Sequence, residues 1–130
     1  MTDIITPDAL ALFDCRPAEL ALYEALAERL LARFPDMEIR AKKTQIGFFD
    51  RRMFACVSLA PVRRKAERPE RFITVSFGLA YPLASPRVVP VRARANRWTH
   101  HVIVGDVGEL DGALLGWLDE AHSFAARSGR

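Results

Sequence analysis

Hydrophobic positions near both ends of the chain recur at steps of three and four residues, which is the period of an amphipathic helix. Residues 17–34 carry one such apolar stripe, with acidic residues early and basic residues late, as the helix dipole favours. At the other end, Asp106 and Glu109 have the spacing of a capping box, and a second apolar stripe continues to Ala125. The pattern therefore predicts a long helix near each end of the chain.

In the middle of the chain the period changes to two, which is typical of strands with one buried face. Residues 50–52 read as a hairpin turn and residues 61–71 as a charged loop. Three prolines within residues 81–96 predict an irregular crossing with one helical turn capped by Ser85. The five predicted strands cover residues 37–42, 46–49, 53–59, 72–79 and 98–104.

Helices at the ends and strands between them indicate an α+β fold, an antiparallel sheet of about five strands with the N- and C-terminal helices packed on one face. Alternate residues of two central strands should point under the helices: Met53, Ala55, Val57, Leu59, Ile73, Val75, Phe77 and Leu79. The residues between them should face away: Phe54, Cys56, Ser58, Thr74 and Ser76. This open face carries small polar groups, which suits either a bound ligand or plain hydration.

The chain has room for one domain over residues 1–130, with a core at residues 17–127. Residues 1–16 are expected to form an extension or a short helix, in which Thr6 is the cap and Pro7 the first helical residue.

Charge is distributed unevenly along the 130 residues, although the formal net charge is only +3. Residues 40–97 hold 14 Lys and Arg against 3 acids, while the segments before and after them are acidic. Once the elements are placed, this split predicts acidic helices on one side of the molecule and basic strands and loops on the other.

Several classes of protein are excluded at this stage. No apolar run approaches the roughly 20 residues that span a bilayer, and the N-terminus lacks the pattern of a signal peptide. Two cysteines without Cys-x-x-Cys spacing favour neither a disulfide scaffold nor a thiolate zinc site, and Asp50, Cys56 and His101 have no metal-ligand spacing. We expect a cytoplasmic protein with no membrane contact, no metal and no cofactor.

A set of ordered motifs resembles a family of small bacterial proteins that is known as a domain of unknown function. The similarity runs from the helix at Pro17 to the helix at Leu110–Ala121, and it implies no established activity. It also suggests, more remotely, the α+β architecture of the iron-chaperone-like YdhG domains. One region departs from the family pattern, because residues 81–84 are more apolar than the basic stretch expected there. The motifs are Lys43-Thr44-Gln45-Ile46-x-Phe48, Arg51-Arg52, Ser76-Phe77-Gly78-Leu79, Ser85-Pro86-Arg87 and Arg97-Trp98-Thr99-His100-His101.

Lys43, Gln45, Arg51 and Arg52 form the first candidate site, because they stand at the ends of adjacent strands and could converge on one edge. Arg offers a planar fork for a carboxylate or phosphate, Lys a point charge and Gln a donor and an acceptor. The competing interpretation is an edge strand that is kept soluble by its cations.

Trp98 follows a run of arginines (Arg87, Arg92, Arg94 and Arg97), a combination that occurs at sites for single-stranded nucleic acid. The alternative is a solvated loop with Trp98 at the edge of the core. His101 shares its strand face with Thr99, on the side opposite Trp98 and His100, and its charge can change near neutral pH.

These observations favour a non-catalytic binding module for an anionic ligand, either single-stranded nucleic acid or a phosphorylated or carboxylated small molecule. The candidate ligand-binding residues are Lys43, Gln45, Arg51, Arg52, Ser76, Trp98 and His101. One alternative is a homodimeric interaction module that uses the open face or an edge strand. Another is a small enzyme in which His101 acts with Cys56 or Ser76.

Overall fold

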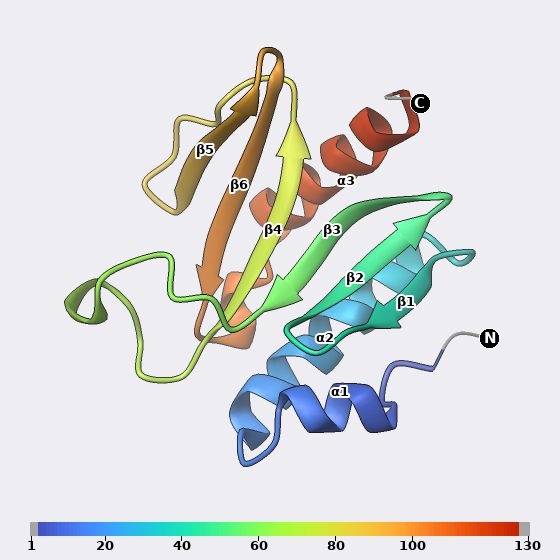
Figure 1. Ribbon diagram of the computed structural model, residues 1–130, viewed down its shortest axis with the longest axis vertical. Helices are drawn as coiled ribbons and strands as arrows, with labels where there is room; N and C mark the ends of the chain where they lie inside the picture. Colours follow the sequence, from blue (N-terminus) through green and yellow to red (C-terminus); the bar gives the residue numbers. More distant parts are fainter. Residues whose placement is uncertain (1–2, 128–130) are drawn as a thin grey trace.

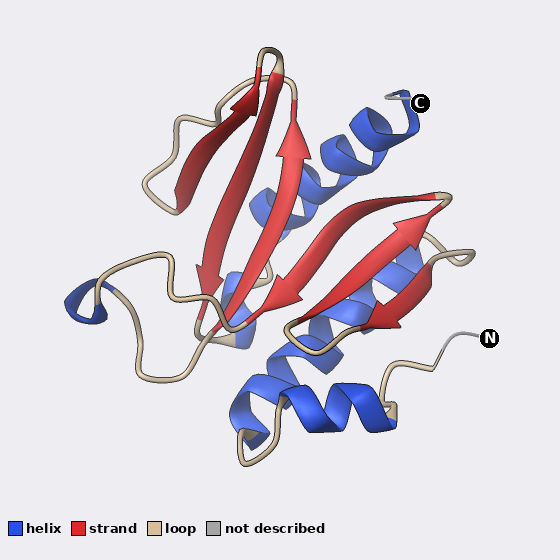
Figure 2. Ribbon diagram, in the orientation of Figure 1, coloured by secondary structure: helices blue, strands red, loops and turns tan. Residues whose placement is uncertain are grey.

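A single antiparallel sheet of six strands forms the centre of the molecule in the computed structural model, which describes residues 3–127. The strand order is β1-β2-β3-β4-β6-β5, and the long helices lie behind one face of the sheet (Figures 1 and 2). The predicted α+β class, with the helices on one face, is confirmed. The strands are β1 (Glu38–Ala41), β2 (Gln45–Asp50), β3 (Arg52–Ser58), β4 (Ile73–Leu79), β5 (Val88–Arg94) and β6 (Arg97–Val104).

The helices begin close to the positions that the sequence predicts. The first, α1 (Pro7–Leu12), has Thr6 as its N-cap, whose hydroxyl accepts a hydrogen bond from Ala9 N–H at 3.2 Å. It is followed by α2 (Pro17–Arg33) and, at the other end, by α3 (Gly112–Arg127). Two short 3₁₀ turns complete the set, η1 (Lys65–Glu67) and η2 (Val107–Glu109). Within residues 3–127, no helix is both long enough and apolar enough to cross a membrane.

The crossing predicted over residues 81–96 is in fact partly a strand, β5. It pairs with β6 on one side and forms an edge of the sheet. Pro90 has no backbone N–H to donate, which an edge strand tolerates because it pairs with a neighbour on one side only. The predicted helical turn at Ser85 is a hydrogen-bonded turn, in which Val88 N–H donates to Ser85 O at 3.1 Å. The number of strands is therefore six instead of five.

The predicted capping box is present but begins a different element. Asp106 and Glu109 cap η2, and Glu109 also accepts a hydrogen bond from Gly105 N–H at 2.7 Å. The long helix starts later, at α3, where Asp111 accepts a hydrogen bond from Leu114 N–H at 3.0 Å. Asp111 thus caps the long helix, and it lies between η2 and α3.

A β-bulge reverses two of the side-chain directions expected in β3. Phe48 lies opposite Ala55 and Phe49 lies opposite Met53, so Phe54 is an extra residue in β3. Phe54 consequently turns toward the helices and is 3% exposed, whereas Met53 is 44% exposed. Both predictions were wrong because strict alternation fails at a bulge.

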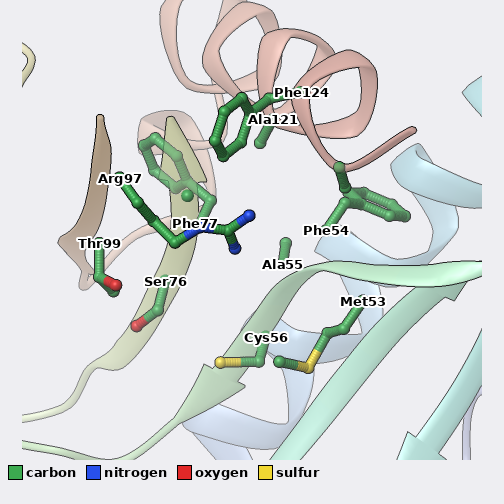
Figure 3. A pocket seen from close by; sticks show the side chains of 12 residues that line it. Met53, Phe54, Ala55, Cys56, Ser76, Phe77, Arg97, Thr99, Ala121 and Phe124 are labelled. Carbon is green, nitrogen blue, oxygen red and sulfur yellow. The ribbon is translucent and has the colours of Figure 1, made fainter. Parts of the chain in front are cut away.

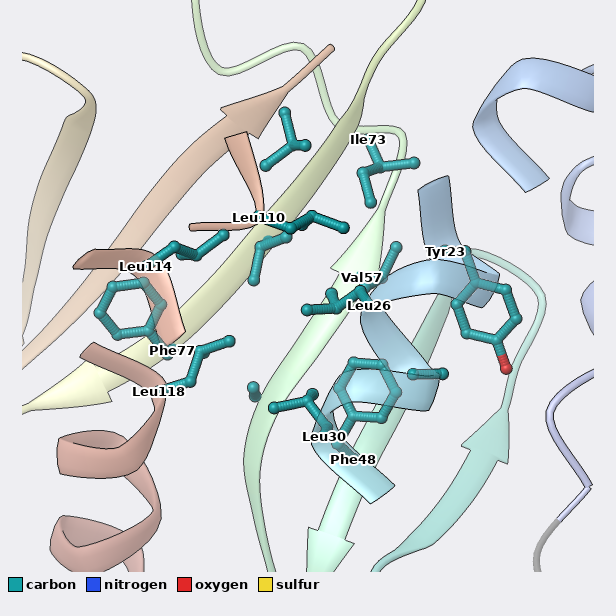
Figure 4. Packing of buried hydrophobic residues seen from close by; sticks show 14 of the residues in the cluster. Tyr23, Leu26, Leu30, Phe48, Val57, Ile73, Phe77, Leu110, Leu114 and Leu118 are labelled. Atoms are coloured by element: carbon teal, nitrogen blue, oxygen red, sulfur yellow. The ribbon is translucent and has the colours of Figure 1, made fainter. Parts of the chain in front are cut away.

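The core lies between the sheet and the two long helices (Figure 4). Leu26 and Leu30 of α2 are fully buried near Phe48 and Val57, and Leu114 and Leu118 of α3 fill the corresponding region beneath β4. The described cluster also includes the predicted inward residues Ala55, Ile73, Val75, Phe77 and Leu79.

The pairing of β3 with β4 covers only part of each strand. It runs from Ser58 opposite Thr74 to Ala55 opposite Phe77, and no pairing is recorded beyond that point within the described chain. From there β3 continues with β2, whereas β4 continues with β6. The two strands separate in a V, with α3 behind the opening (Figure 1).

Candidate functional site

A cleft of about 190 Å³ occupies the V between β3 and β4 (Figure 3). Phe54, Phe77 and Phe124 line its apolar side; Phe124 reaches it from α3 and is half-buried, whereas Phe54 and Phe77 belong to the core and are each 3% exposed. Hydroxyl groups of Ser76 and Thr99 line it on the open side of the sheet. The cleft is therefore apolar on the helix side and polar at its mouth, a common arrangement in small-molecule sites.

Among residues 3–127, Arg97 is the only charged residue that lines this cleft. Its side chain starts on β6, crosses β4 and ends between the walls (Figure 3), with Cζ 5.2 Å from the centroid of the Phe124 ring. Gly78, the neighbour on β4, has no side chain to obstruct this path. Between residues 3 and 127, no carboxylate forms an ion pair with Arg97. The cleft thus holds a cation whose charge no acid of the described chain neutralises.

Other arginines are engaged in holding the fold together. Arg87 donates from Nη1 to both carboxylate oxygens of Asp111 at 3.0 Å and from Nη2 to Glu109 O at 2.8 Å. It also lies over the Trp117 ring, which fastens the start of β5 to α3. Arg87, the arginine of the Ser-Pro-Arg motif, is therefore a structural residue. Arg97 differs because it forms no ion pair with a carboxylate of the described chain.

Beside the cleft, three polar side chains form a row across neighbouring strands: Cys56 on β3, Ser76 on β4 and His101 on β6. Ser76 Oγ lies 2.7 Å from His101 Nδ1, and the Ser76 hydroxyl also forms a hydrogen bond with Cys56. Burial raises the pKa of the Cys56 thiol, and the bond to Ser76 lowers it only in part. Burial lowers the pKa of His101, so the row is neutral at pH 7.

The structure does not bring the first candidate group together. Lys43 precedes β2, and Gln45 begins it, whereas Arg51 and Arg52 lie at the hairpin beyond its other end. Five residues, 46–50, lie between Gln45 and Arg51, so the two pairs are about 20 Å apart along the strand. Arg51 has φ of 69°, the left-handed conformation of a tight turn, and its side chain is exposed. Lys43 and Gln45 border a separate shallow hollow with Ser58.

Trp98 and His101 point to opposite faces of β6, as their positions in the sequence predict. Trp98 lies toward the helix side, next to His100, which is fully buried and stacks on Phe77 with centroids 5.2 Å apart. Of the seven candidate residues, Ser76 lines the cleft, and His101 forms a hydrogen bond with Ser76. The sequence indicated Arg97 only as one of the arginines before Trp98, and it did not single out Gly78, Thr99 or the three phenylalanines as site residues.

The expectation of a basic sheet face needs correction. Apart from Arg97 at the start of β6, the central strands present uncharged residues on the open face, and the other cations lie at hairpins, in loops and on the edge strands. Thr74 and Ser76 on this face are also buried, 0% and 8% exposed, and Thr74 donates to Ala60 O at 2.6 Å from the loop that follows β3. The open-face residues of these strands are Gln45, Gly47, Phe49, Met53, Cys56, Ser58, Thr74, Ser76, Gly78, Arg97, Thr99, His101 and Ile103.

Among residues 3–127, no group of three or more His, Cys, Asp and Glu side chains could hold a metal ion. The two cysteines are unpaired thiols, and Cys15 is exposed while Cys56 is half-buried. His122, the third histidine, lies 2.7 Å from Asp50 (Nε2 to Oδ2) and stacks on Phe34 with ring centroids 4.0 Å apart. It connects α3 to the β2–β3 hairpin.

The fold and the cleft define a class of small α+β protein in which a partly separated antiparallel sheet is covered by helices on one face. The family model described as a domain of unknown function (DUF5655) matches residues 12–125, and the chain belongs to this family. The match covers α2, all six strands and most of α3. It confirms the resemblance to a domain of unknown function; the individual motifs and the remoter similarity to YdhG-like domains stay predictions. Comparisons with curated proteins and with solved structures gave no match.

Proposed function

We propose that this protein is a non-catalytic binding module for a small anionic ligand, and that the cleft between β3 and β4 is its site. The observation that carries the proposal is the Arg97 guanidinium, which lies in a largely apolar cleft without a carboxylate partner among residues 3–127. A buried or half-buried charge is costly unless it is paired, so an incoming anion would gain from this position.

The geometry of the guanidinium supports the same function. The guanidinium lies over the Phe124 ring, with Cζ 5.2 Å from the ring centroid. The N–H donors of arginine form a planar fork that can hold a bidentate anion. Thr99 places a hydroxyl group at the mouth of the cleft, where it can complete the coordination of the ligand, whereas the Ser76 hydroxyl is already bonded to His101.

A binding role is favoured over the alternative of a nucleophilic enzyme. A reactive cysteine requires a thiolate, but burial raises the pKa of Cys56. His101 has a lowered pKa and is bonded to Ser76, so it supplies no positive charge that would stabilise a thiolate at pH 7. Homodimerisation and binding of single-stranded nucleic acid remain predictions.

The test is an NMR titration of the uniformly ¹⁵N-labelled protein with acetate, benzoate and inorganic phosphate. We expect saturable shifts of the Ser76, Gly78 and Thr99 amides with at least one of these anions. Arg97→Gln should weaken that binding by about tenfold or more, the loss typical of one charged hydrogen bond. Arg94→Gln, which removes the same charge from an exposed position on the same hairpin, is the matched control and should leave affinity unchanged. Shifts that do not saturate, or equal losses in both variants, would refute the proposed site.

A further inference from the structure

We infer that the ligand is a monocarboxylate with a flat apolar body, such as a small aromatic acid, whose carboxylate meets Arg97 and whose ring enters the cleft. This inference rests on the proposed function and specifies the chemical class of its ligand. It depends on three properties of the cleft: the charge it offers, the groups that line it and its size.

The charge of the cleft matches a single negative charge. Arg97 is the one charged residue in the lining that the described chain provides, and the adjacent His101 is neutral at pH 7 because burial lowers its pKa. The Ser76 hydroxyl is already committed to His101 and Cys56. A phosphate dianion would bring a second charge and further oxygens to a site with one guanidinium and few remaining donors. A carboxylate brings one charge and two oxygens, which fit the planar fork of arginine.

The interior of the cleft is suited to a flat apolar group. Phe124 presents a half-buried ring, Phe54 and Phe77 line the cleft where it meets the core, and Met53 lies beside them with its thioether (Figure 3). Aromatic rings attract one another in offset or edge-to-face arrangements, and a methionine sulfur makes favourable contacts with ring edges. These walls offer an aliphatic chain less specific contact than they offer a ring.

Gly78 provides the space through which such a ligand would pass. A Cβ built on this residue lies 3.8 Å from Trp98 O and 3.9 Å from the Phe124 ring, which are ordinary contact distances. Its backbone has no positive φ, so a larger residue is tolerated there without strain. A side chain at position 78 would therefore narrow the cleft while Arg97 remains in place.

The size of the cleft favours a small acid over a nucleotide. Its volume of about 190 Å³ is below the range of roughly 300–1,000 Å³ that is usual for drug-sized ligands. A single ring with one carboxylate fits such a space, whereas a base, a sugar and a phosphate together would extend far beyond the described lining.

The decisive experiment compares four probes by NMR titration: benzoate, its neutral isostere benzamide, acetate and inorganic phosphate. We expect benzoate to bind most tightly, and benzamide and acetate each to bind about tenfold more weakly, because one lacks the charge and the other the ring. Gly78→Val should reduce benzoate affinity by a similar factor. Gly116→Ala on α3, where an added Cβ meets nothing within 4 Å, is the control and should bind as the unmodified protein does.

The outcomes separate this inference from the proposal on which it rests. Phosphate or acetate binding more tightly than benzoate, with dependence on Arg97, would overturn the ligand class and retain the anion site. Benzamide binding as tightly as benzoate would also overturn the class, because the charge would then be irrelevant. Failure of every probe to bind would overturn both. Amide spectra of Gly78→Val establish its folding, and should that variant be misfolded, Gly78→Ala and Arg97→Gln test the same contacts.

Discussion

Ser76 Oγ and His101 Nδ1 lie 2.7 Å apart across β4 and β6, and this contact joins the mouth of the cleft to the middle of the open sheet face. The adjacent residue, His100, points to the other face, where Leu83 N–H donates to its Nε2 at 3.0 Å. Two consecutive histidines are thus held by different elements on opposite sides of one strand.

The first prediction concerns the dependence of stability on pH. Burial lowers the pKa of both His100 and His101 below the ordinary value of 6.5. As the pH falls through 6.5, the unfolded chain takes up protons that the folded chain does not, so the free energy of unfolding decreases until the lowered folded pKa values are passed. Urea unfolding at a series of pH values between about 7.5 and 5 should show this decrease.

Substitution of each histidine shows which one causes the decrease in the free energy of unfolding. His101→Gln should flatten the profile in this interval in part, because it removes one of the two histidines whose pKa is lowered by folding, and His100 remains. Asp111 serves as an internal check: the N–H of Leu114 and then Arg87 lower its carboxylate pKa, so its contribution is lost only at more acidic pH. A profile that stays equally steep in His101→Gln and His100→Asn would show that another group is responsible.

The second prediction tests the β-bulge in β3. Phe54→Ala should lower the free energy of unfolding by about 3–5 kcal/mol, because its ring is buried against Phe34 and His122. Met53→Ala, one residue earlier, should cost well under about 1 kcal/mol, because Met53 is largely exposed. Chemical denaturation of the two variants measures the difference. A larger cost for Met53→Ala would mean that the strand follows simple alternation without the bulge.

The third prediction concerns Gly47, over which two side chains of the open face close. A Cβ at this position would lie 2.7 Å from Cε1 of Phe49 and 2.9 Å from Sδ of Met53. Gly47→Ala should therefore destabilise the protein by about 1–3 kcal/mol through overpacking. Gly116→Ala is the matched control and should be neutral or stabilising by up to about 1 kcal/mol, because alanine favours the helix. Equal thermal stability of the two variants would contradict the close contact.

Much of the fold follows from local patterns in the sequence. The apolar stripe containing Leu26 and Leu30 and the alternation of Ile73, Val75 and Phe77 correctly identified the residues at the core. Such patterns are reliable because each element must bury one face. The edge strand β5 was missed because proline and arginine are disfavoured in central strands but tolerated at an edge, and local sequence does not tell which kind of strand is present.

The candidate site was predictable only in part. Alternation alone places Ser76 and His101 on one face, and the register then brings them into contact. The cleft depends on where the pairing of β3 with β4 stops, which is a property of the whole sheet and of α3 behind it. Arg97 was indicated only as one of the arginines before Trp98 and not as part of a cleft, and Lys43 and Arg51 suggested a convergence that the length of β2 prevents.

The early end of the β3–β4 pairing has a consequence for how members of this family can diversify. At the open end of the V, no backbone hydrogen bonds pair the described residues of β3 with those of β4. Side chains from α3 and from β6 lie between the two strands there instead. Residues at positions 53, 78 and 97 can therefore change in size or polarity without the loss of a pairing between these two strands. The sheet thus contains a region whose side chains can vary in sequence largely independently of the fold.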